Sequence, residues 1–311
     1  MKQLSIWILV LSLLTWQGIL YWPVTIHIRS ADSQKSFSIR MPLKDKQRLD
    51  FFFREVCFLN VWAYTLLGSK PSSVDQYTKP WNAFLNGIQN PDFFGILRLC
   101  FWPPNFGRIC YLLTPHQLKI KLGWETLNKY FHYFTNSRFF LYADYSNDRE
   151  TMILNVVNKH ELVAVVKQHL EDFQDVLTSH GIKVEELIEN EKILAFMKCL
   201  QHEGFSGTLL GYGRDNAWLY YKYRQINPLE WPMVSAWQEE ELVNLERLNQ
   251  RTAAFQPWEL SDVFYPRFSC DPQSEETKQL KATYRAEREK IIQYFEDKDL
   301  VEAGLSLFTQ E

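Results

Sequence analysis

The stretch RFFLYADYSNDRETMILNVVNKHELVAVVKQHL, residues 138–170, combines the strand and helix signals that decide the fold class. Within it the β-prone runs FFLYA and TMILNVV flank the turn-rich sequence YSNDRE, an order that is typical of a β-hairpin. Asn158 precedes Glu161 by three residues, which is an asparagine variant of the capping box that begins helices. An amphipathic apolar stripe follows and Gly181 closes it, so the segment predicts a hairpin joined directly to a helix.

Helical periodicity extends to much of the remaining chain. Gly68 is expected to end the first helix in a left-handed conformation, and Ser235 with Gln238 predicts the start of another. Residues 112–122 fit either a strand or a short helix. The fold class that we predict is α+β, mainly α: a helical globular domain with a small antiparallel β-hairpin near 138–157. The segments with helical spacing of apolar residues are about 44–67, 124–134, 184–202 and 274–295.

Composition and charge divide the chain into predicted units. With 311 residues, of which 46% are hydrophobic and 23% charged, the chain can bury a core, and its 22 Phe, 15 Tyr and 11 Trp residues predict that this core is rich in rings. From Glu230 to Glu311 there are 17 acidic and 9 basic residues, a net charge of −8, which is typical of a solvated helical surface or of an acidic surface for a protein partner. We predict a signal anchor or transmembrane segment at 1–29, the globular domain at 30–227, and a looser acidic helical extension at 228–311.

The N-terminal segment predicts a membrane anchor. No charged residue lies between Lys2 and His27, and 16 of the 23 positions from Leu4 to Ile26 are hydrophobic. This length matches the roughly 20 helical residues that cross a bilayer. A cleaved signal peptide is the alternative, although suitable small residues before a cleavage site are hard to find. Basic residues flank the segment on both sides, which leaves the orientation in the membrane open.

The stretch GFSGTLLGYGRDN, residues 204–216, is the most unusual candidate for a binding site. Glycines permit positive φ angles and close backbone approach, exposed backbone N–H groups can surround an anion, and an arginine adds a forked donor. The spacing matches neither a phosphate-binding P-loop nor a dinucleotide-binding fingerprint. The structural alternative is close helix packing, because GTLLG, residues 207–211, has small residues four apart. The residues predicted to hold an anionic group are Gly207, Gly211, Gly213, Arg214, Asp215 and Asn216.

The histidines, cysteines and possible nucleophiles of the chain form few recognisable sequence motifs. The seven histidines include no pair four residues apart and no HExxH motif, so we predict neither a metal site nor a cofactor. A net charge of −3 gives no drive toward nucleic acid, and no GxSxG nucleophile motif occurs. Among five cysteines without a CxxC pair, Cys100 and Cys110 flank a turn-rich stretch, and a disulfide between them would close a short loop in an oxidising compartment.

Four blocks of sequence occur along the chain in this order: FFFREVCFLNVWAYTLLGSKP, GWETLNKYFHYF, RFFLYAD and GTLLGYGRDNAWLYYKYR. Together they resemble a group of uncharacterised proteins from Chlamydia-related bacteria. The resemblance spans about residues 45–225 and implies a single-anchor or exported protein of a bacterial cell envelope. It implies no activity and carries over no catalytic or binding residue.

These patterns favour a non-enzymatic protein of the cell envelope, membrane-anchored or exported, that interacts with a host or another protein partner. The hypothesis depends on the membrane segment at residues 4–26, the acidic C-terminal third and the absence of a catalytic sequence motif. The alternative is a ligand-binding protein or an enzyme that uses residues 204–216, with Arg214 as the main contact to an anionic group.

Overall fold

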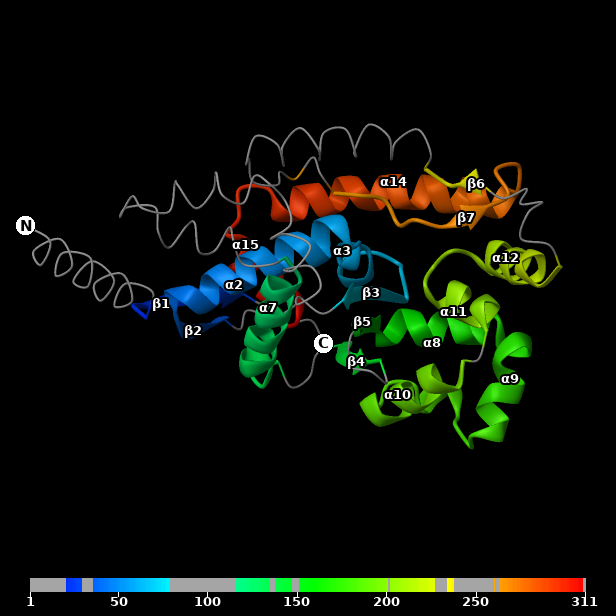
Figure 1. The fold of residues 1–311 in the computed structure, drawn as a ribbon, viewed down its shortest axis with the longest axis horizontal. Coiled ribbons are helices and arrows are strands. Elements are labelled where there is room, and N and C mark those ends of the chain that lie inside the picture. Colours follow the sequence, from blue (N-terminus) through cyan, green and yellow to red (C-terminus); the bar gives the residue numbers. More distant parts are fainter. Residues whose placement is uncertain are drawn as a thin grey trace, which may run out of the picture.

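The computed structural model describes most of the chain as a mainly helical α+β fold with small antiparallel sheets (Figure 1). None of the helices in the described part is both long enough and apolar enough to cross a membrane. The structure describes residues 21–29, 36–78, 116–134, 138–146, 151–200, 202–226, 234–237, 260 and 263–309.

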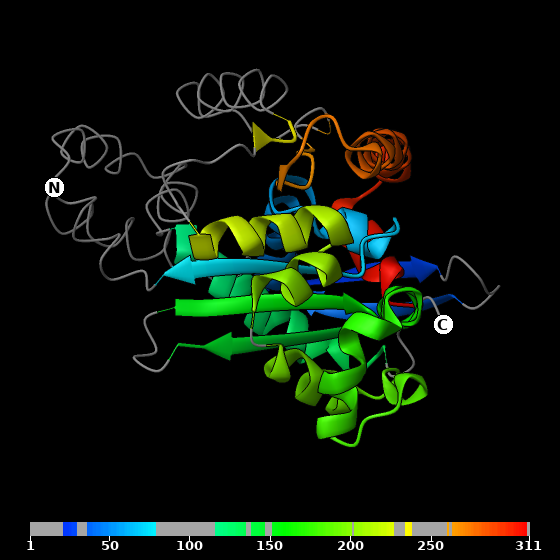
Figure 2. The ribbon, with the colours of Figure 1, turned by 90° about the vertical axis from the view of Figure 1, so that its right-hand side faces the viewer.

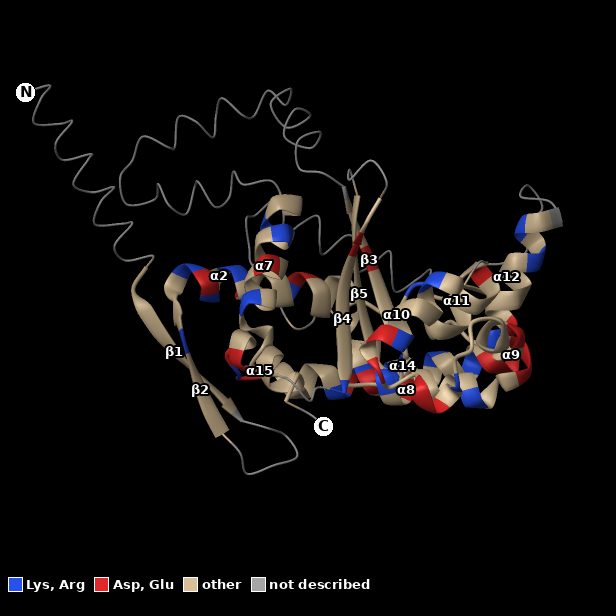
Figure 3. Cartoon of the chain, turned by 90° about the horizontal axis from the view of Figure 1, so that it is seen from below, with Lys and Arg blue, Asp and Glu red and all other residues tan. Residues whose placement is uncertain are grey.

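A three-stranded sheet stands at the centre of the described part. Strand β5 (Thr151–Asn158) pairs antiparallel with β4 (Phe139–Tyr145) on one side and with β3 (Ser72–Thr78) on the other. The β4–β5 pair confirms the predicted hairpin, whereas β3, which lies far away in sequence, was not predicted. Residues 152, 154 and 156 of β5 contact one hydrophobic core and Val157 contacts another, so the central strand is covered on both faces. Figures 2 and 3 show helices on both sides of this sheet.

The first core packs one face of the sheet against helices from both ends of the chain. Strands β1 and β2 form a two-stranded ribbon that also contributes side chains to this core. The elements that build this side of the molecule are β1 (Pro23–Arg29), β2 (Ser36–Pro42), α2 (Leu43–Phe53), the π-helix η1 (Arg54–Leu59), α3 (Trp62–Leu66), α7 (His116–Phe131), α14 (Glu275–Phe295) and α15 (Leu300–Leu307).

The second core lies between the other face of the sheet and a group of shorter helices. Helix α8 begins at the predicted cap, because Asn158 Oδ1 accepts from the Glu161 N–H at 3.4 Å. The predicted long helix is divided at His169 and closes at Gly181, whose φ is 62°. The elements on this side are α8 (Lys159–Gln168), α9 (Leu170–Ser179), the 3₁₀ turn η3 (Val184–Glu186), α10 (Asn190–Cys199), α11 (Glu203–Leu209) and α12 (Arg214–Ile226).

The predicted continuous helix over 44–67 is wrong. The α-helical hydrogen bonding ends at Phe53, a π-helix follows, and Val61 has a left-handed φ of 60° before α3 begins. A contact from a distant segment favours this break, because the Phe58 carbonyl accepts a hydrogen bond from the Phe264 N–H at 2.8 Å. Gly68 does not adopt the predicted left-handed conformation. A side chain there would collide with the carboxylate of Glu287, which explains the glycine by close packing instead.

Residues 23–29 correct the predicted boundary of the N-terminal segment. They form strand β1, whose side chains Ile26 and Ile28 are buried in the first core. The Trp22 carbonyl also accepts from the Leu43 N–H at 2.9 Å. The last part of the predicted 1–29 segment therefore belongs to the folded body, and residues 1–20 lie outside the described residues.

The C-terminal residues also differ from the predicted loose extension. Helix α14 agrees closely with the prediction for 274–295, and Ser274 Oγ caps it by accepting from the Thr277 N–H at 3.1 Å. However, α14 and α15 supply residues of the first core, and so does the fully buried Phe308, which follows α15 directly. Residues 234–235 form strand β6, which pairs with β7 (Ser269–Cys270), and residues 236–237 form a turn, so the predicted helix does not begin at Ser235. The rest of that helix, residues 238–254, lies outside the described residues.

Phe308→Ala should destabilise the fold strongly. The Phe308 ring packs against Phe53, Phe131, Phe134 and Phe139, with ring centroids 5.5–6.4 Å apart. Loss of a buried ring and the resulting cavity should lower the free energy of unfolding by about 3–5 kcal/mol. The measurement is chemical denaturation followed by circular dichroism.

Leu170→Ala provides the control for this variant, because Leu170 is 41% exposed. It should change the free energy of unfolding by less than about 1 kcal/mol. A Phe308→Ala loss as small as this would mean that the C-terminal segment contributes little to the core.

Candidate functional site

The glycine-rich stretch forms the close junction of α11 and α12. Gly211 and Gly213 have φ angles of 74° and 84°, which glycine adopts without strain. A Cβ atom at Gly207 would lie 2.8 Å from the Cβ of Ala217 in α12, so the glycine lets the two helices approach each other. This geometry agrees with the structural interpretation of the GTLLG pattern.

Arg214 forms an ion pair with a helix of the second core. Its Nε and one terminal nitrogen donate to the two carboxylate oxygens of Asp172 in α9, at 2.6 and 2.8 Å. The hydrogen bonds that Arg214 donates to Asp172 lower the pKa of Asp172 and raise the pKa of Arg214. The forked donor that was predicted to hold an anionic ligand therefore holds a carboxylate of the chain itself.

The N-terminus of α12 is also occupied by a carboxylate from within the chain. The two oxygens of Glu276, in the first turn of α14, accept from the backbone N–H groups of Asp215 and Asn216 at 3.1 and 2.9 Å. Helix N-termini attract anions because their first N–H groups lack partners in the helix. Glu276 thus supplies the negative charge that this terminus favours.

The buried Asn216 side chain joins three segments. Its Nδ2 donates to the Tyr212 carbonyl, and its Oδ1 accepts from the Asp271 N–H and from Thr277 Oγ1, at 3.1–3.2 Å. Both ends of the amide are satisfied by these contacts. Asn216 therefore connects α12 with the loop before α14.

The six predicted site residues thus lie together at one junction, but their polar groups contact other parts of the chain. Binding of an anionic ligand by these residues stays a prediction. An anion that used the same donors would have to compete with Asp172 and Glu276. Cys100 and Cys110, the predicted disulfide, lie outside the described residues. Within the described ranges, no group of three or more His, Cys, Asp or Glu side chains is placed to hold a metal ion.

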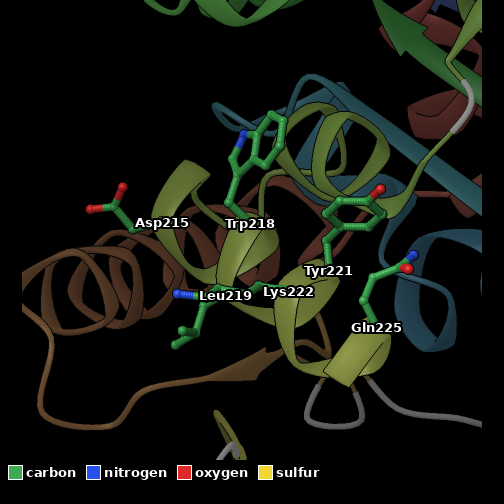
Figure 4. A pocket seen from close by; sticks show the side chains of 6 residues that line it. All are labelled: Asp215, Trp218, Leu219, Tyr221, Lys222 and Gln225. Carbon is green, nitrogen blue, oxygen red and sulfur yellow. The ribbon is translucent and has the colours of Figure 1, made fainter. Parts of the chain in front are cut away.

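A shallow hollow of about 520 Å³ lies beside this junction, on the outer face of α12. Figure 4 shows six lining side chains, and among the described residues the lining comes from this one helix. Its surface is mostly apolar, with an acidic residue near the start of the helix and a basic residue two turns later. The lining residues are Asp215, Trp218, Leu219, Tyr221, Lys222 and Gln225.

Aromatic packing fixes two of these side chains against α11. The imidazole of His202 stacks between Phe205 and Tyr221, with ring centroids 4.0 and 4.3 Å away, and Trp218 meets it edge-on at 5.0 Å. Burial lowers the pKa of His202, which favours the neutral ring in this stack. Trp218 and Tyr221 are therefore held in place before any partner binds.

A second group of polar side chains is buried beneath β3, and no sequence motif predicted it. Lys70 is only 2% exposed, and its Nζ donates to the Ser72 carbonyl at 2.6 Å and to Ser73 Oγ at 2.8 Å. Burial lowers the pKa of Lys70 to about 7, although the nearby Asp75 acts in the opposite direction. The same burial raises the pKa of Asp75 well above its ordinary value, against the attraction of Lys70.

Two acidic residues of this region, Asp75 beside Lys70 and Glu55 in η1, have incomplete hydrogen bonding. Asp75 Oδ2 and Glu55 Oε2 are buried and accept no hydrogen bond within the described part of the chain. The other Glu55 oxygen lies 2.8 Å from His116 Nε2. Buried unpaired oxygens and a π-helix are typical of functional sites. The three hollows beside α11 and α12 are lined by other residues.

Arg214→Ala should lower the free energy of unfolding by about 1 kcal/mol at neutral pH, because it leaves the mostly buried Asp172 without its partner. A carboxylate whose pKa is lowered by folding stabilises the native state above its ordinary pKa, and this contribution disappears as the pH falls. The difference in the free energy of unfolding between Arg214→Ala and the wild type should therefore become smaller below about pH 4. Denaturant unfolding at several pH values measures it.

Arg224→Ala is the matched control in the same helix. The partner of Arg224, Glu203, is more exposed than Asp172, so the loss should be smaller. Equal losses in the two variants would contradict a structural role specific to the Arg214–Asp172 pair.

Lys70→Met should change how stability depends on pH. In the unfolded chain Lys70 stays protonated up to about pH 10, whereas burial favours the neutral amine above about pH 7. The unfolded state then binds more protons, so the wild-type free energy of unfolding should rise between about pH 7 and about pH 9. The variant should show a smaller rise in denaturant unfolding.

Lys167→Met is the control, because the Lys167 side chain is 54% exposed. Its free energy of unfolding should depend on pH as it does in the wild type. If the free energy of unfolding of Lys70→Met rises with pH as much as that of the wild type, Lys70 does not titrate in this pH range.

Comparison with known proteins identifies no relative: no family model, curated protein or solved structure matches this chain.

Proposed function

We propose that this chain is a non-enzymatic interaction protein that is anchored in a membrane by the uncharged segment at its N-terminus. The resemblance noted in the sequence favours a bacterial cell envelope as its location. The observation that carries the proposal is a pair of exposed aromatic rings, Tyr21 and Trp22, at the point where the uncharged segment meets the folded body.

These two rings are the most exposed large hydrophobic side chains in the described part of the chain, at 61% and 68%. Tyrosine and tryptophan favour the interface between lipid and water because one end of the ring system is apolar and the other polar. Strand β1 begins directly after Trp22, whose carbonyl is bonded to the start of α2. The rings are therefore attached to the folded body without a spacer.

Basic side chains lie close to the rings. Lys44 Nζ lies 3.6 Å from the centroid of the Tyr21 ring, and the exposed Arg40 is in the adjoining strand β2. The nearest acidic residue in α2, Asp45, is buried and is paired with Lys129 at 2.7 Å. A surface with exposed rings and cations suits the anionic headgroups of a membrane.

The segment before β1 still has a suitable length. Residues 4–22 comprise nineteen positions without a charge. A helix of this length would measure about 28 Å, close to the roughly 30 Å of a bilayer's hydrocarbon core. The boundary set by β1 therefore shortens the predicted anchor and keeps it compatible with a membrane span.

The position of the α11–α12 junction relative to the proposed anchor supports a role in binding a partner. Along the long axis of the molecule, β1 and β2 lie at one end and α9–α12 at the opposite end (Figures 1 and 3). An anchor that leads into β1 would present the α11–α12 junction away from the lipid surface. The hollow on α12 would then be open to a partner.

Flotation of the full chain with vesicles of phosphatidylcholine and phosphatidylglycerol tests the anchor. The wild type should move to the top of the density gradient with the vesicles. Leu11→Arg combined with Leu14→Arg should abolish flotation, because each charge costs about 2.5–3.5 kcal/mol at the centre of a membrane helix. Leu11→Phe with Leu14→Phe is the matched control and should float. Wild-type protein that stays at the bottom would overturn the proposal.

The two rings are tested separately. Tyr21→Ser with Trp22→Ser should increase the fraction of protein that alkaline carbonate extracts from the vesicles, because the interfacial contacts are lost. The control pair is Tyr133→Ser with Tyr145→Ser, since these rings are 49% and 51% exposed but lie elsewhere on the body. Equal extraction of both pairs would exclude a specific role of Tyr21 and Trp22.

A further inference from the structure

Only some of the charges on α12 are neutralised within the chain. Arg214 is held by Asp172, and Arg224 forms an ion pair with Glu203. The Asp215 side chain is 71% exposed, and within the described part of the chain its one ion-pair contact is the edge of the Arg214 guanidinium, at 3.4 Å. Lys222 is exposed and forms no ion pair with any residue that the structure describes.

The two residues that carry the remaining charges come from different turns of α12. Asp215 is in the first turn of the helix, and Lys222 is seven residues later, which corresponds to two turns and roughly 10 Å along the axis. Trp218 and Leu219 lie between them in sequence, and all four residues line the same hollow (Figure 4). The face therefore has an acidic start, an apolar middle and a basic end.

Such a face is complementary to itself when a second copy is turned through 180°. Two antiparallel copies of α12 bring Asp215 of each chain opposite Lys222 of the other, and they align the helix dipoles favourably. The midpoint of this arrangement falls between Trp218 and Leu219. We propose that the chain forms a two-fold symmetric homodimer through this face of α12, with reciprocal Asp215–Lys222 ion pairs around an apolar centre.

The size of the face sets the strength of the dimer. A helix of 13 residues is about 20 Å long, so two copies bury less than a standard stable protein interface. Trp218 and Tyr221 add contact area that is already ordered, since α11 holds both rings in place. The dimer is therefore weak in dilute solution, and confinement to a membrane would strengthen it by raising the effective concentration. The dimer itself does not depend on the proposed membrane anchor.

Sedimentation of the full chain in a non-ionic detergent, over a series of protein concentrations, measures the dissociation constant. The wild type should shift from monomer to dimer as the concentration rises. Asp215→Lys places two lysines opposite each other at both ends of the interface, and Lys222→Asp places two aspartates there. Each variant alone should raise the dissociation constant by about tenfold or more.

Mixing the two variants gives the decisive result. A chain with Asp215→Lys carries lysine at both positions, and a chain with Lys222→Asp carries aspartate at both. The mixture should form a heterodimer with nearly wild-type affinity, because every opposed pair again has opposite charges. A chain with both substitutions should form a homodimer in the same way. This recovery also shows that the variants are folded.

Control substitutions at matched positions exclude a general charge effect. Glu171→Lys changes an acidic residue in the first turn of α9, and Lys167→Asp changes a basic residue in the last turn of α8. Both should leave the dissociation constant unchanged. A wild type that stays monomeric at the highest concentration would overturn the proposal, as would a dimer that neither single variant weakens or a mixture that does not recover.

The experiments can contradict the proposed dimer and the proposed membrane anchor separately. Flotation without dimers in detergent would contradict the α12 interface alone, and dimers of a chain that does not float would contradict only the anchor.

Discussion

The central strand β5 imposes the main constraint on this fold, because it is buried on both faces. A buried strand needs apolar side chains on both sides, and its backbone groups need partners on both edges. β4 satisfies one edge from the neighbouring sequence, whereas β3 satisfies the other from nearly eighty residues earlier. The two hydrophobic cores then follow, one on each side of the sheet. The first of them unites residues near both ends of the described chain.

Polar contacts connect these two cores around β3. Ser72 Oγ donates to the Leu209 carbonyl at 2.8 Å, and the Tyr284 hydroxyl donates to the Gly211 carbonyl, so the α11–α12 junction is attached both to the sheet and to α14. Lys70 lies beneath the same junction. Removing a lysine from water is costly. Its hydrogen bonds to Ser72 and Ser73, together with the lowered pKa of its amine, reduce that cost.

The features that could be predicted from the sequence are those that depend on neighbouring residues. The hairpin, the Asn158 cap and the helix that begins after Ser274 each depend on residues close in sequence, and each is present. The break at Val61 occurs beside a hydrogen bond between Phe58 and a segment two hundred residues later, and no local pattern contains that contact. The same applies to β3 and to the C-terminal part of the core. The uncharged, mostly apolar run up to Ile26 was consistent with a membrane segment, but pairing with β2 incorporates its last part into the sheet.

The candidate site shows the same limit at the level of single side chains. The sequence shows that glycines, Arg214, Asp215 and Asn216 lie together, and this much is correct because they are neighbours in the chain. Their partners could not be predicted, since Asp172 and Glu276 come from α9 and α14. A cluster of donors becomes available to a ligand only if no internal carboxylate reaches it. At this junction the internal pairs neutralise Arg214 and the helix terminus, so the exposed charges that remain for another molecule are those on the outer face of α12.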